Sequence, residues 1–333
     1  MTSFSYNNNN MFFLHYFQLL MISFLIYATT ITFAFPRSIS EYNIWDGAFS
    51  KPGRPSWLIP LWGSGGDPTA GTMTQYLKNN QFDVLGITEA KTWIVNATTD
   101  KPSVDIIASA MGYKYSLLVE FPGDEYHLAF MSKSEIVFLE GLKKNFSHSG
   151  AIAKIEDVIY ILVQLNPFSS SNREIEAQIV KEKVEKYNAL GMPVVVFGDF
   201  NSLSPQDGAA GLHKDYNCSC PNQACEWACK DGKIDYDPVN IILSANMTDL
   251  CWYDSKKFTC QGSYPTEVYS QPYPTIRIDY IMVNDAFKTK WESTYDVPAN
   301  AEVIKNNWTE HTSDHYPIQL IGPSGGWEDD DEL

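Results

Sequence analysis

The chain has 333 residues, of which 44% are hydrophobic and 14% aromatic, and its formal net charge is −16. This composition supplies enough apolar material for a large core, and it carries no sign of disorder or of a repeat array. The acidic balance argues against a strongly basic face that follows nucleic acid by counterion release, although local cations or a bound metal can offset an acidic average. We therefore expect one folded domain without an extended basic surface.

The first 34 residues resemble a secretory signal peptide. A nearly uncharged apolar run at 11–27 follows four asparagines, and Thr32 and Ala34 suit the two positions that a signal peptidase reads. No Lys or Arg precedes the run, which departs from the usual pattern. We predict cleavage after Ala34 and no stable membrane span in the remainder; an uncleaved signal anchor is the alternative.

Residues 42–321 alternate between predicted strands and helices, with no linker long enough to separate two domains. The predicted strands are 42–45, 82–88, 113–119, 127–131, 136–139, 158–165, 193–197, 278–283 and 316–321. The predicted helices are 69–80, a segment between the cap Ser103 and Gly112, 172–191 and 237–246. Such alternation predicts layered α/β packing.

The clearest helix is predicted at 172–191 and ends at Gly191. Its apolar face is expected to carry Ile175, Ile179, Val184 and Tyr187, opposite Lys and Glu. The strand that follows, at 193–197, is almost wholly apolar. We therefore expect it to be buried on both faces.

All six cysteines lie in a region interpreted as an insertion at about 211–262. They are Cys218, Cys220, Cys225, Cys229, Cys251 and Cys260. We predict three disulfides, whose pairing the sequence does not determine. A zinc site from the first four cysteines is the alternative, although their spacing is not a regular zinc pattern. The loop begins where the preceding strand ends, so we expect the insertion to border the residues that carry the chemistry and to help choose the substrate.

Two further features fit the secretory pathway. Asn-x-Ser/Thr acceptors occur at Asn96, Asn145, Asn217, Asn246 and Asn307, but a chain this rich in these residues carries several by chance. The acidic tail at 324–333 ends in Asp330-Asp331-Glu332-Leu333, which resembles the Lys-Asp-Glu-Leu retention signal with its first residue changed. We predict a protein that is secreted or retained in the endoplasmic reticulum lumen; a solvated acidic tail is the alternative.

Polar residues follow the apolar strand at 193–197. In Gly198-Asp199-Phe200-Asn201, the acid and the amide are two residues apart, so on an extended segment they face the same way. Such a pair can simply bind turn amides, which is the usual role of Asp and Asn at strand ends. Further acids at other strand ends favour a functional role.

A second carboxylate, Asp279, stands inside the apolar strand at 278–283. An unpaired buried charge costs several kcal/mol, so a partner is expected. His315, just ahead of the strand at 316–321, is that partner, because an acid beside an imidazole fixes its tautomer and raises its basicity. The neighbouring Asp314 is left to face a metal ion.

Two more oxygen-bearing side chains occur on or beside predicted strands. Glu89 follows the strand at 82–88, and Asn43 belongs to the strand at 42–45. A lone Glu at such a position is more often a surface acid than a ligand. Oxygen ligands of this kind suit Mg²⁺, which binds few protein carboxylates and keeps several waters.

Together these residues resemble the endonuclease/exonuclease/phosphatase superfamily, which includes pancreatic-type deoxyribonucleases, abasic-site endonucleases, inositol polyphosphate 5-phosphatases and neutral sphingomyelinases. The residues that carry the resemblance are, in chain order, Asn43, Glu89, Asp199, Asn201, Asp279, Asp314 and His315. The resemblance implies a four-layer α/β sandwich of two facing mixed β-sheets flanked by helices, in one domain at 35–323. It also implies metal-dependent cleavage of a phosphate ester.

The resemblance assigns a role to each of these side chains. Glu89 would hold Mg²⁺ or Mn²⁺, with Asn43 and Asp314 nearby. His315, oriented by Asp279, would activate water or stabilise the transition state. Asp199 and Asn201 would position the nucleophile and the phosphate. Members differ over whether the imidazole or the carboxylate corresponding to Asp199 is the base.

One position departs from the family pattern. Many members carry a His ahead of the long helix where this chain has Gln164, followed by Asn166. We expect both residues to bind phosphate, but an amide cannot deliver a proton to a leaving group. The alternative function is therefore a catalytically weakened or inactive binding protein on the same scaffold.

The expected substrate is a phosphodiester, either in nucleic acid or in a phospholipid headgroup, and the expected state is a monomer. A lipid substrate calls for exposed aromatic residues near the site, for which Trp227, Trp252 and Tyr253 are candidates. Ordinary packing against the disulfides is the alternative for those aromatics.

Overall fold

The computed structural model describes most of the chain. The described residues are 35–44, 72–80, 82–91, 104–121, 126–214, 228–252, 262–266, 275–306 and 309–323, with the single positions Trp93, Gly123, Tyr216, Cys218 and Cys260. Several predictions fall outside them: the signal peptide, the acidic tail, Ser103, Cys220, Cys225, Trp227, Tyr253, and the glycosylation acceptors Asn96, Asn217 and Asn307.

One six-stranded sheet has the order β13-β14-β1-β2-β4-β3. Its strands are β1 (Ser38–Asn43), β2 (Val84–Thr88), β3 (Tyr115–Val119), β4 (Leu128–Ser132), β13 (Ala301–Val303) and β14 (Ile318–Ile321). β1 and β2 are parallel, and the other neighbours are antiparallel. The sheet is therefore mixed.

The second six-stranded sheet has the order β11-β12-β8-β7-β6-β5. Its strands are β5 (Ile136–Gly141), β6 (Ser149–Ile155), β7 (Val158–Gln164), β8 (Val194–Asp199), β11 (Met247–Asp249) and β12 (Asp279–Asn284). Only β7 and β8 are parallel among its pairs. The parallel pair is connected through the long helix α4 (Ser170–Ala189).

The two sheets pack face to face across an apolar core, with β1 and β2 in contact with β8. On β8, Val195 and Phe197 face this inner core while Val194 and Val196 face the opposite side, so the strand is buried on both faces as predicted. Gly86 on β2 lies where the sheets approach closely, because a Cβ atom there would be 2.5 Å from the Phe197 ring.

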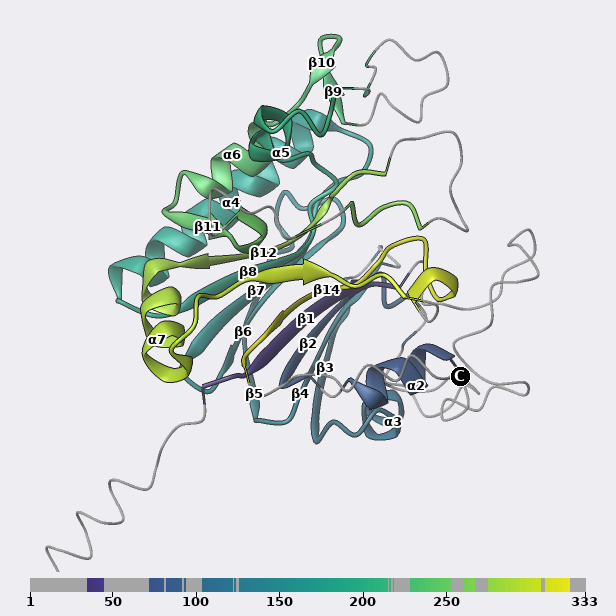
Figure 1. Cartoon of the computed structure of the whole chain (residues 1–333), viewed down its shortest axis with the longest axis vertical. Coiled ribbons are helices and arrows are strands. Elements are labelled where there is room, and N and C mark those ends of the chain that lie inside the picture. Colours follow the sequence, from purple (N-terminus) through teal and green to yellow (C-terminus); the bar gives the residue numbers. More distant parts are fainter. Residues whose placement is uncertain are drawn as a thin grey trace, which may run out of the picture. The chain divides into compact units, whose positions relative to one another are not determined.

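Helices cover the outer face of each sheet (Figure 1). α2 (Thr72–Asn79) and α3 (Val104–Ala110) share a core with the first sheet, whereas α4 and α6 (Asp237–Leu243) share one with the second. α7 (Asp285–Tyr295) closes one end of the inner core with Phe287 and Trp291. The structure thus confirms the predicted four-layer α/β sandwich. Within the described part of the chain, no helix has both the length and the hydrophobicity needed to cross a membrane.

Several elements were missed by the sequence analysis, notably β6, α7, β11 and β13. β6 reads Ser-Gly-Ala-Ile-Ala-Lys-Ile, which is poor in β-branched and aromatic residues. It forms a strand because β5 and β7 pair with it on both sides. β1 also begins earlier than predicted, since Ser38 to Glu41 pair with β14.

The predicted apolar face of α4 is wrong at Ile175, near the start of the helix. Ile175 is 47% exposed, while the charged residues Arg173 and Glu176 are buried. Val184 and Tyr187 are buried as predicted. The helix is rotated because Arg173 and Glu176 bind the loop at Asn166 through buried hydrogen bonds, which outweigh the burial of one isoleucine.

Two disulfides, Cys218–Cys229 and Cys251–Cys260, join four of the six cysteines. Because Cys218 and Cys229 bind each other, they are not available as zinc ligands. Within 211–262, α6 and β11 belong to the sandwich. The four described cysteines therefore lie on either side of these elements. Cys229 belongs to the short strand β9 (Cys229–Lys230), which pairs with β10 (Lys233–Ile234), and Cys251 lies in a 3-10 turn at Leu250–Trp252.

Candidate active site

Four polar side chains form a row across the second sheet. Ser149 on β6 pairs with Gln164 on β7, Gln164 pairs with Asp199 on β8, and Asp199 pairs with Asp279 on β12. All four are buried, and each lies two residues from an inner apolar residue of its own strand, so their side chains point to the same face of the sheet as those residues. The row therefore faces the other sheet, at the edge where β7 and β8 end.

Two residues at the corresponding edge of the first sheet meet this row. Asn43, the last residue of β1, donates hydrogen bonds from Nδ2 to Glu89 Oε1 (3.1 Å) and Asp199 Oδ2 (3.0 Å). Gln164 Nε2 donates to the same Glu89 oxygen (2.9 Å). Glu89 thus accepts one amide from each sheet, and Asn43 links the two layers.

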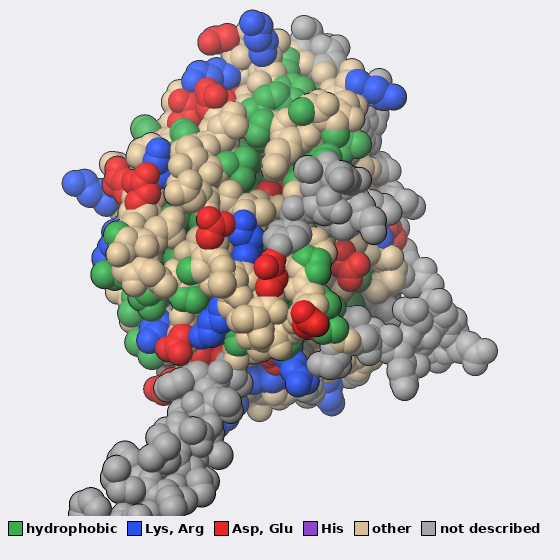
Figure 2. All heavy atoms as spheres, turned by 60° about the vertical axis from the view of Figure 1, so that its left-hand side comes forward, with side chains coloured by type: hydrophobic (Ala, Val, Ile, Leu, Met, Phe, Trp, Pro, Cys, Tyr) green, Lys and Arg blue, Asp and Glu red, His purple; other side chains and the backbone are tan. Residues whose placement is uncertain are grey.

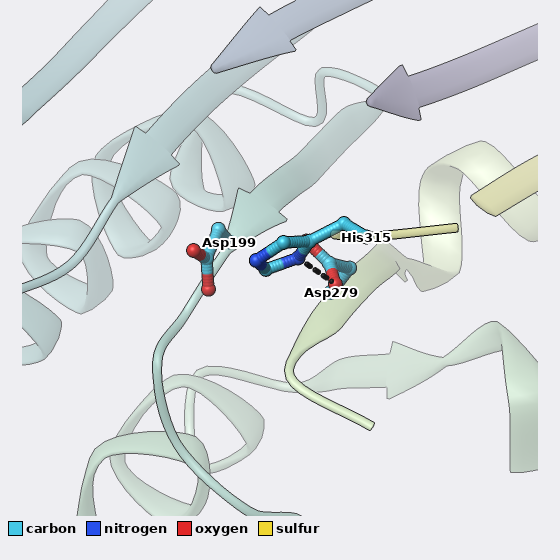
Figure 3. Close-up of side chains that lie close together, drawn as sticks. All are labelled: Asp199, Asp279 and His315. Carbon is cyan, nitrogen blue, oxygen red and sulfur yellow. Dashed lines mark hydrogen bonds and ion pairs between the residues drawn. The ribbon is translucent and has the colours of Figure 1, made fainter. Parts of the chain in front are cut away.

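The predicted pair between Asp279 and His315 is present. His315 Nδ1 lies 2.8 Å from Asp279 Oδ2, and both side chains are buried. A carboxylate only accepts hydrogen bonds, so Nδ1 carries the proton and donates it. Figure 3 shows the imidazole between the carboxylates of Asp279 and Asp199, with its second nitrogen on the side of Asp199.

In the Gly-Asp-Phe-Asn segment, backbone geometry requires the glycine, and side-chain hydrogen bonds explain the asparagine. Gly198 has φ +137°, and a Cβ atom there would lie 1.9 Å from the carbonyl oxygen of Val163 on the parallel strand β7. Asn201 Nδ2 donates to Asp199 Oδ2 (3.2 Å) and to the Leu165 carbonyl (3.0 Å). The segment holds the Asp199 carboxylate in one orientation.

Asp314 and Asn166 lie beside the cluster with different contacts. Asp314 is buried next to His315, and its carbonyl accepts a hydrogen bond from Thr266 N (2.9 Å). The side-chain oxygen of Asn166 accepts from the amides of Phe168 (2.7 Å) and Ser169 (2.6 Å). That oxygen therefore caps its own turn, a use that the sequence did not reveal.

Burial concentrates acidic charge in this cluster. Desolvation, followed by the nearby Asp279, raises the pKa of Asp199 to about 8. Burial opposes the charged form of His315, but Asp279 and more weakly Asp314 raise the pKa of that ring well above its usual value. Burial is the first cause of the Asp199 shift, and the contributions of neighbouring carboxylates to both pKa values reflect acidic surroundings that a bound cation would offset.

The donor set fits a divalent metal ion. Asp199, Asp279 and His315 each place a possible ligand atom within 4.8 Å of the others. His315 Nδ1 is already bound to Asp279, so the oxygen donors beside this group, Glu89, Asn43 and Asp314, are the candidate ligands. Within the described part of the chain, two buried oxygens of the cluster, Asp279 Oδ1 and Gln164 Oε1, have no hydrogen-bond partner. A group of carboxylate and amide oxygens of this kind suits Mg²⁺ or Mn²⁺.

Two supporting residues, Glu41 and Ser263, were not predicted from the sequence. Glu41, two residues before Asn43, is fully buried, and desolvation followed by Asp279 and Asp199 raises its pKa well above the usual value. Ser263 Oγ accepts from the amides of Ile278 (3.0 Å) and Asp279 (3.1 Å). Glu41 could have been noticed in the sequence, because it is an acid inside a predominantly buried strand. Nothing in the sequence around Ser263 indicated its role.

A buried ion cluster supports the strand that carries Asp279. Arg277 donates to Asp207 Oδ1 and Asp249 Oδ2, both at 2.7 Å, and all three side chains are buried. Trp252 Nε1 also donates to Asp207 Oδ1 (2.6 Å), so this aromatic residue is tied to the cluster. Through Trp252, which follows Cys251, the second cysteine-containing segment is connected to Arg277, two residues before Asp279.

The segment after Cys260 reaches the site directly. Tyr264 packs on His315 with ring centroids 4.8 Å apart, and Ser263 O accepts from Tyr316 N (2.8 Å). The segment that directly follows the predicted insertion therefore borders the chemistry, and the expectation for the insertion itself stays a prediction.

A two-sheet sandwich with an acid–imidazole pair and acidic strand ends defines a class of phosphoesterase-like proteins. The chain belongs to the Endonuclease/Exonuclease/phosphatase family, whose model matches residues 42–315. Members of this family are hydrolases that act on phosphoester bonds and depend on divalent metal ions.

Solved structures share the fold at low sequence identity. An AP endonuclease from Archaeoglobus fulgidus is 17% identical with a TM-score of 0.52, covering 86% of this chain and 99% of its own. The 3'-5' exonuclease NExo from Neisseria meningitidis is 17% identical with a TM-score of 0.53 and the same coverage. A 3' phosphatase NExo bound to a product DNA hairpin is 16% identical, with a TM-score of 0.53 and coverage of 86% and 99%. Comparison with curated protein sequences finds no match.

Proposed function

We propose that this protein is a metal-dependent phosphodiesterase of the secretory pathway. The observation that carries the proposal is the buried His315–Asp279 pair facing Asp199 across the ends of the paired strands. Membership of a family of phosphoester hydrolases supports it. The two disulfides support an oxidising compartment, in line with the signal peptide predicted at 1–34.

The metal ligands in this proposal are Glu89, Asn43 and Asp314, with Mg²⁺ or Mn²⁺ as the ion. When bound, the ion supplies positive charge that offsets charge developing on the phosphate. Asp199 and Asn201 position the nucleophilic water and the phosphate. His315, held by Asp279, acts through its second nitrogen, which lies on the side of Asp199 (Figure 3).

Gln164 and Asn166 form the proposed phosphate-binding side of the site. Gln164 already donates to Glu89, so its amide is oriented toward the region where ligand and metal would meet. The amide can donate to a phosphate oxygen but carries no acidic proton for a leaving group. We therefore expect turnover that is slower than with an imidazole at this position.

The substrate is a phosphodiester in nucleic acid or in a phospholipid headgroup. On the face shown in Figure 2, described Lys and Arg side chains are interspersed with Asp and Glu and form no continuous basic band. Contacts confined to a few phosphates near the site fit this surface better than a long nucleic-acid track.

The test is an activity assay on purified protein with Mg²⁺, using plasmid DNA, sphingomyelin vesicles and bis-p-nitrophenyl phosphate. We expect cleavage of at least one substrate, loss of that cleavage with a chelator, and loss in Asp199→Ala. A wild-type protein inactive on all three substrates would contradict the proposal.

The second candidate function is a binding protein on a retired enzyme scaffold, which the amide at Gln164 favours. The buried acid–imidazole pair argues against it, because a retired site has no need to keep a buried carboxylate beside a second one. Phosphodiester binding by the wild-type protein without cleavage, at an affinity unchanged in Asp199→Ala, is the result that this function predicts.

A further inference from the structure

Three aromatic rings form a continuous series beside the candidate active site. Tyr126 and His148 have ring centroids 4.8 Å apart, and His148 and Phe168 have centroids 6.2 Å apart at an edge-on angle of 68°. Lys91 Nζ lies 5.2 Å from the Tyr126 ring centre at the other end. We call this set the aromatic series.

Each member follows or precedes a strand at the same edge as the site. His148 is next to Ser149, which pairs with Gln164, and Ser149 Oγ donates to the carbonyl of Tyr126 (2.8 Å). Phe168 follows Asn166 by two residues, and Lys91 follows Glu89 by two. A phosphate bound near Gln164 and Glu89 would therefore have the aromatic series beside it.

Phe168 is the most exposed large hydrophobic side chain of the described residues, at 82%. Its backbone is nevertheless held firmly. The Phe168 amide donates to Asn166 Oδ1 (2.7 Å), and the Asn166 amide donates to the buried Glu176 (2.7 Å). The buried Arg173 side chain donates to the carbonyl of Asn166 (3.1 Å). An exposed ring on a loop held by two buried charged residues is a preorganised contact surface.

We propose that the aromatic series is a stacking subsite for a nucleobase next to the phosphodiester, so that the substrate class is single-stranded nucleic acid. This rests on the function proposed above. Bases stack on aromatic faces largely without regard to sequence, and only an unpaired base exposes its face. Lys91 adds a cation near the path of the backbone.

A lipid surface fits these observations less well. Insertion into a membrane interface needs a broad apolar face, whereas here the exposed Phe168 adjoins His148, and the series ends at the cationic Lys91. The rings of the series are tilted or edge-on to one another, so the preference for a base comes from the exposed ring of Phe168 rather than from apolar area.

The test compares binding of two labelled single strands by fluorescence anisotropy. One is a short oligothymidylate, and the other has an abasic residue in place of each interior thymidine. Binding is measured with Mg²⁺ in an Asp199→Asn background, so that the readout does not depend on cleavage. We expect the intact strand to bind about 10-fold more tightly than the abasic strand.

Phe168→Ala in that background should bring the affinity ratio close to one, and Phe168→Trp should restore it. Phe168→Leu should behave as Ala does, because a leucine offers apolar area but no π-face. Phe138→Ala, which removes an exposed phenylalanine on the edge strand β5, is the matched control and should keep the full ratio.

The proposal is overturned if the wild-type ring gives no preference for the intact strand, or if Phe168→Ala keeps that preference. Loss of sphingomyelin-vesicle binding in Phe168→Ala, with an unchanged strand ratio, would assign the ring to membrane contact instead. If Phe168→Ala removes the preference for the intact strand but the wild-type protein cleaves no phosphodiester, the hydrolase function alone is refuted. If the wild-type protein cleaves a phosphodiester but shows no preference for the intact strand, the stacking subsite alone is refuted.

Discussion

Asp199 and Asp279 are direct cross-strand partners on the antiparallel strands β8 and β12. Their side chains therefore face the same way, both buried, at the point where the sheet meets Asn43 from the opposite layer. Like charges at such positions repel, and the raised pKa of Asp199 reflects both its burial and this neighbour. His315 offsets Asp279, so the three side chains form one unit.

We expect His315 and Asp279 to act together in turnover. His315→Ala should lower kcat by about 100-fold to 10,000-fold, the range for loss of a positioned acid or base. Asp279→Asn should also lower kcat, because the ring loses the acceptor that orients it. The double variant should be little worse than the poorer single variant, since residues that act as a unit are non-additive. Steady-state kinetics on bis-p-nitrophenyl phosphate, with Asp285→Asn as a surface control, check this; multiplicative losses would show independent roles.

Glu89→Gln should weaken Mg²⁺ binding by at least about 10-fold, because it removes a negative ligand while keeping the shape of the side chain. Isothermal titration calorimetry with Mg²⁺ and Mn²⁺ measures this without turnover. Glu174→Gln is the matched control, since Glu174 belongs to a second acidic group that already binds Lys230. Equal metal affinity in wild type and Glu89→Gln would remove Glu89 from the site.

Gln164→His should raise kcat by about 10-fold or more, because an imidazole at this buried position can deliver a proton to the leaving group. A ring nitrogen can still donate to Glu89, as the amide does now. Gln164→Asn, which shortens the amide and adds no acid, should be slower than wild type. If Gln164→His leaves the rate unchanged while Asp199→Ala abolishes it, the substitution is immaterial and the family difference at this position has no catalytic meaning.

Arg277→Ala should lower the free energy of unfolding by about 3–5 kcal/mol, because it leaves Asp207 and Asp249 as buried charges without their cation. Urea denaturation measures the change. Lys154→Ala removes a half-exposed partner of Asp157 and should cost less than about 1 kcal/mol. A similar small effect at Arg277 would show that the buried cluster is not a support for the strand that carries Asp279.

The Cys251–Cys260 disulfide should stabilise the fold by about 2–3 kcal/mol, the value for a closed loop of this length. Both cysteines lie in the inner core between the sheets, so replacing them with alanine keeps apolar side chains at these two positions. The double alanine variant should unfold at a lower urea concentration than wild type. A thiol reductant should reduce the difference between the two unfolding midpoints, because it opens the bridge in the wild-type protein. Identical midpoints without reductant would show that this bridge adds no stability.

The strands beside the site were predictable because their signal is local. The apolar runs that form β7 and β8 end in a polar residue, and the run that forms β12 begins with one. A carboxylate inside an apolar strand needs a partner, and for Asp279 that partner is His315. Residue types and their order along the chain were therefore sufficient to identify the family and most of the candidate site.

The arrangement of these residues was decided only by tertiary structure. β6 became a strand because two neighbours pair with it, and α4 turned Ile175 outward because Arg173 and Glu176 bind the loop at Asn166. The bridge from Asn43 to Asp199 and the row from Ser149 to Asp279 join residues far apart in the sequence. Periodicity reports only the faces of one element, whereas register and the contact between sheets depend on energies shared by segments that no local pattern connects.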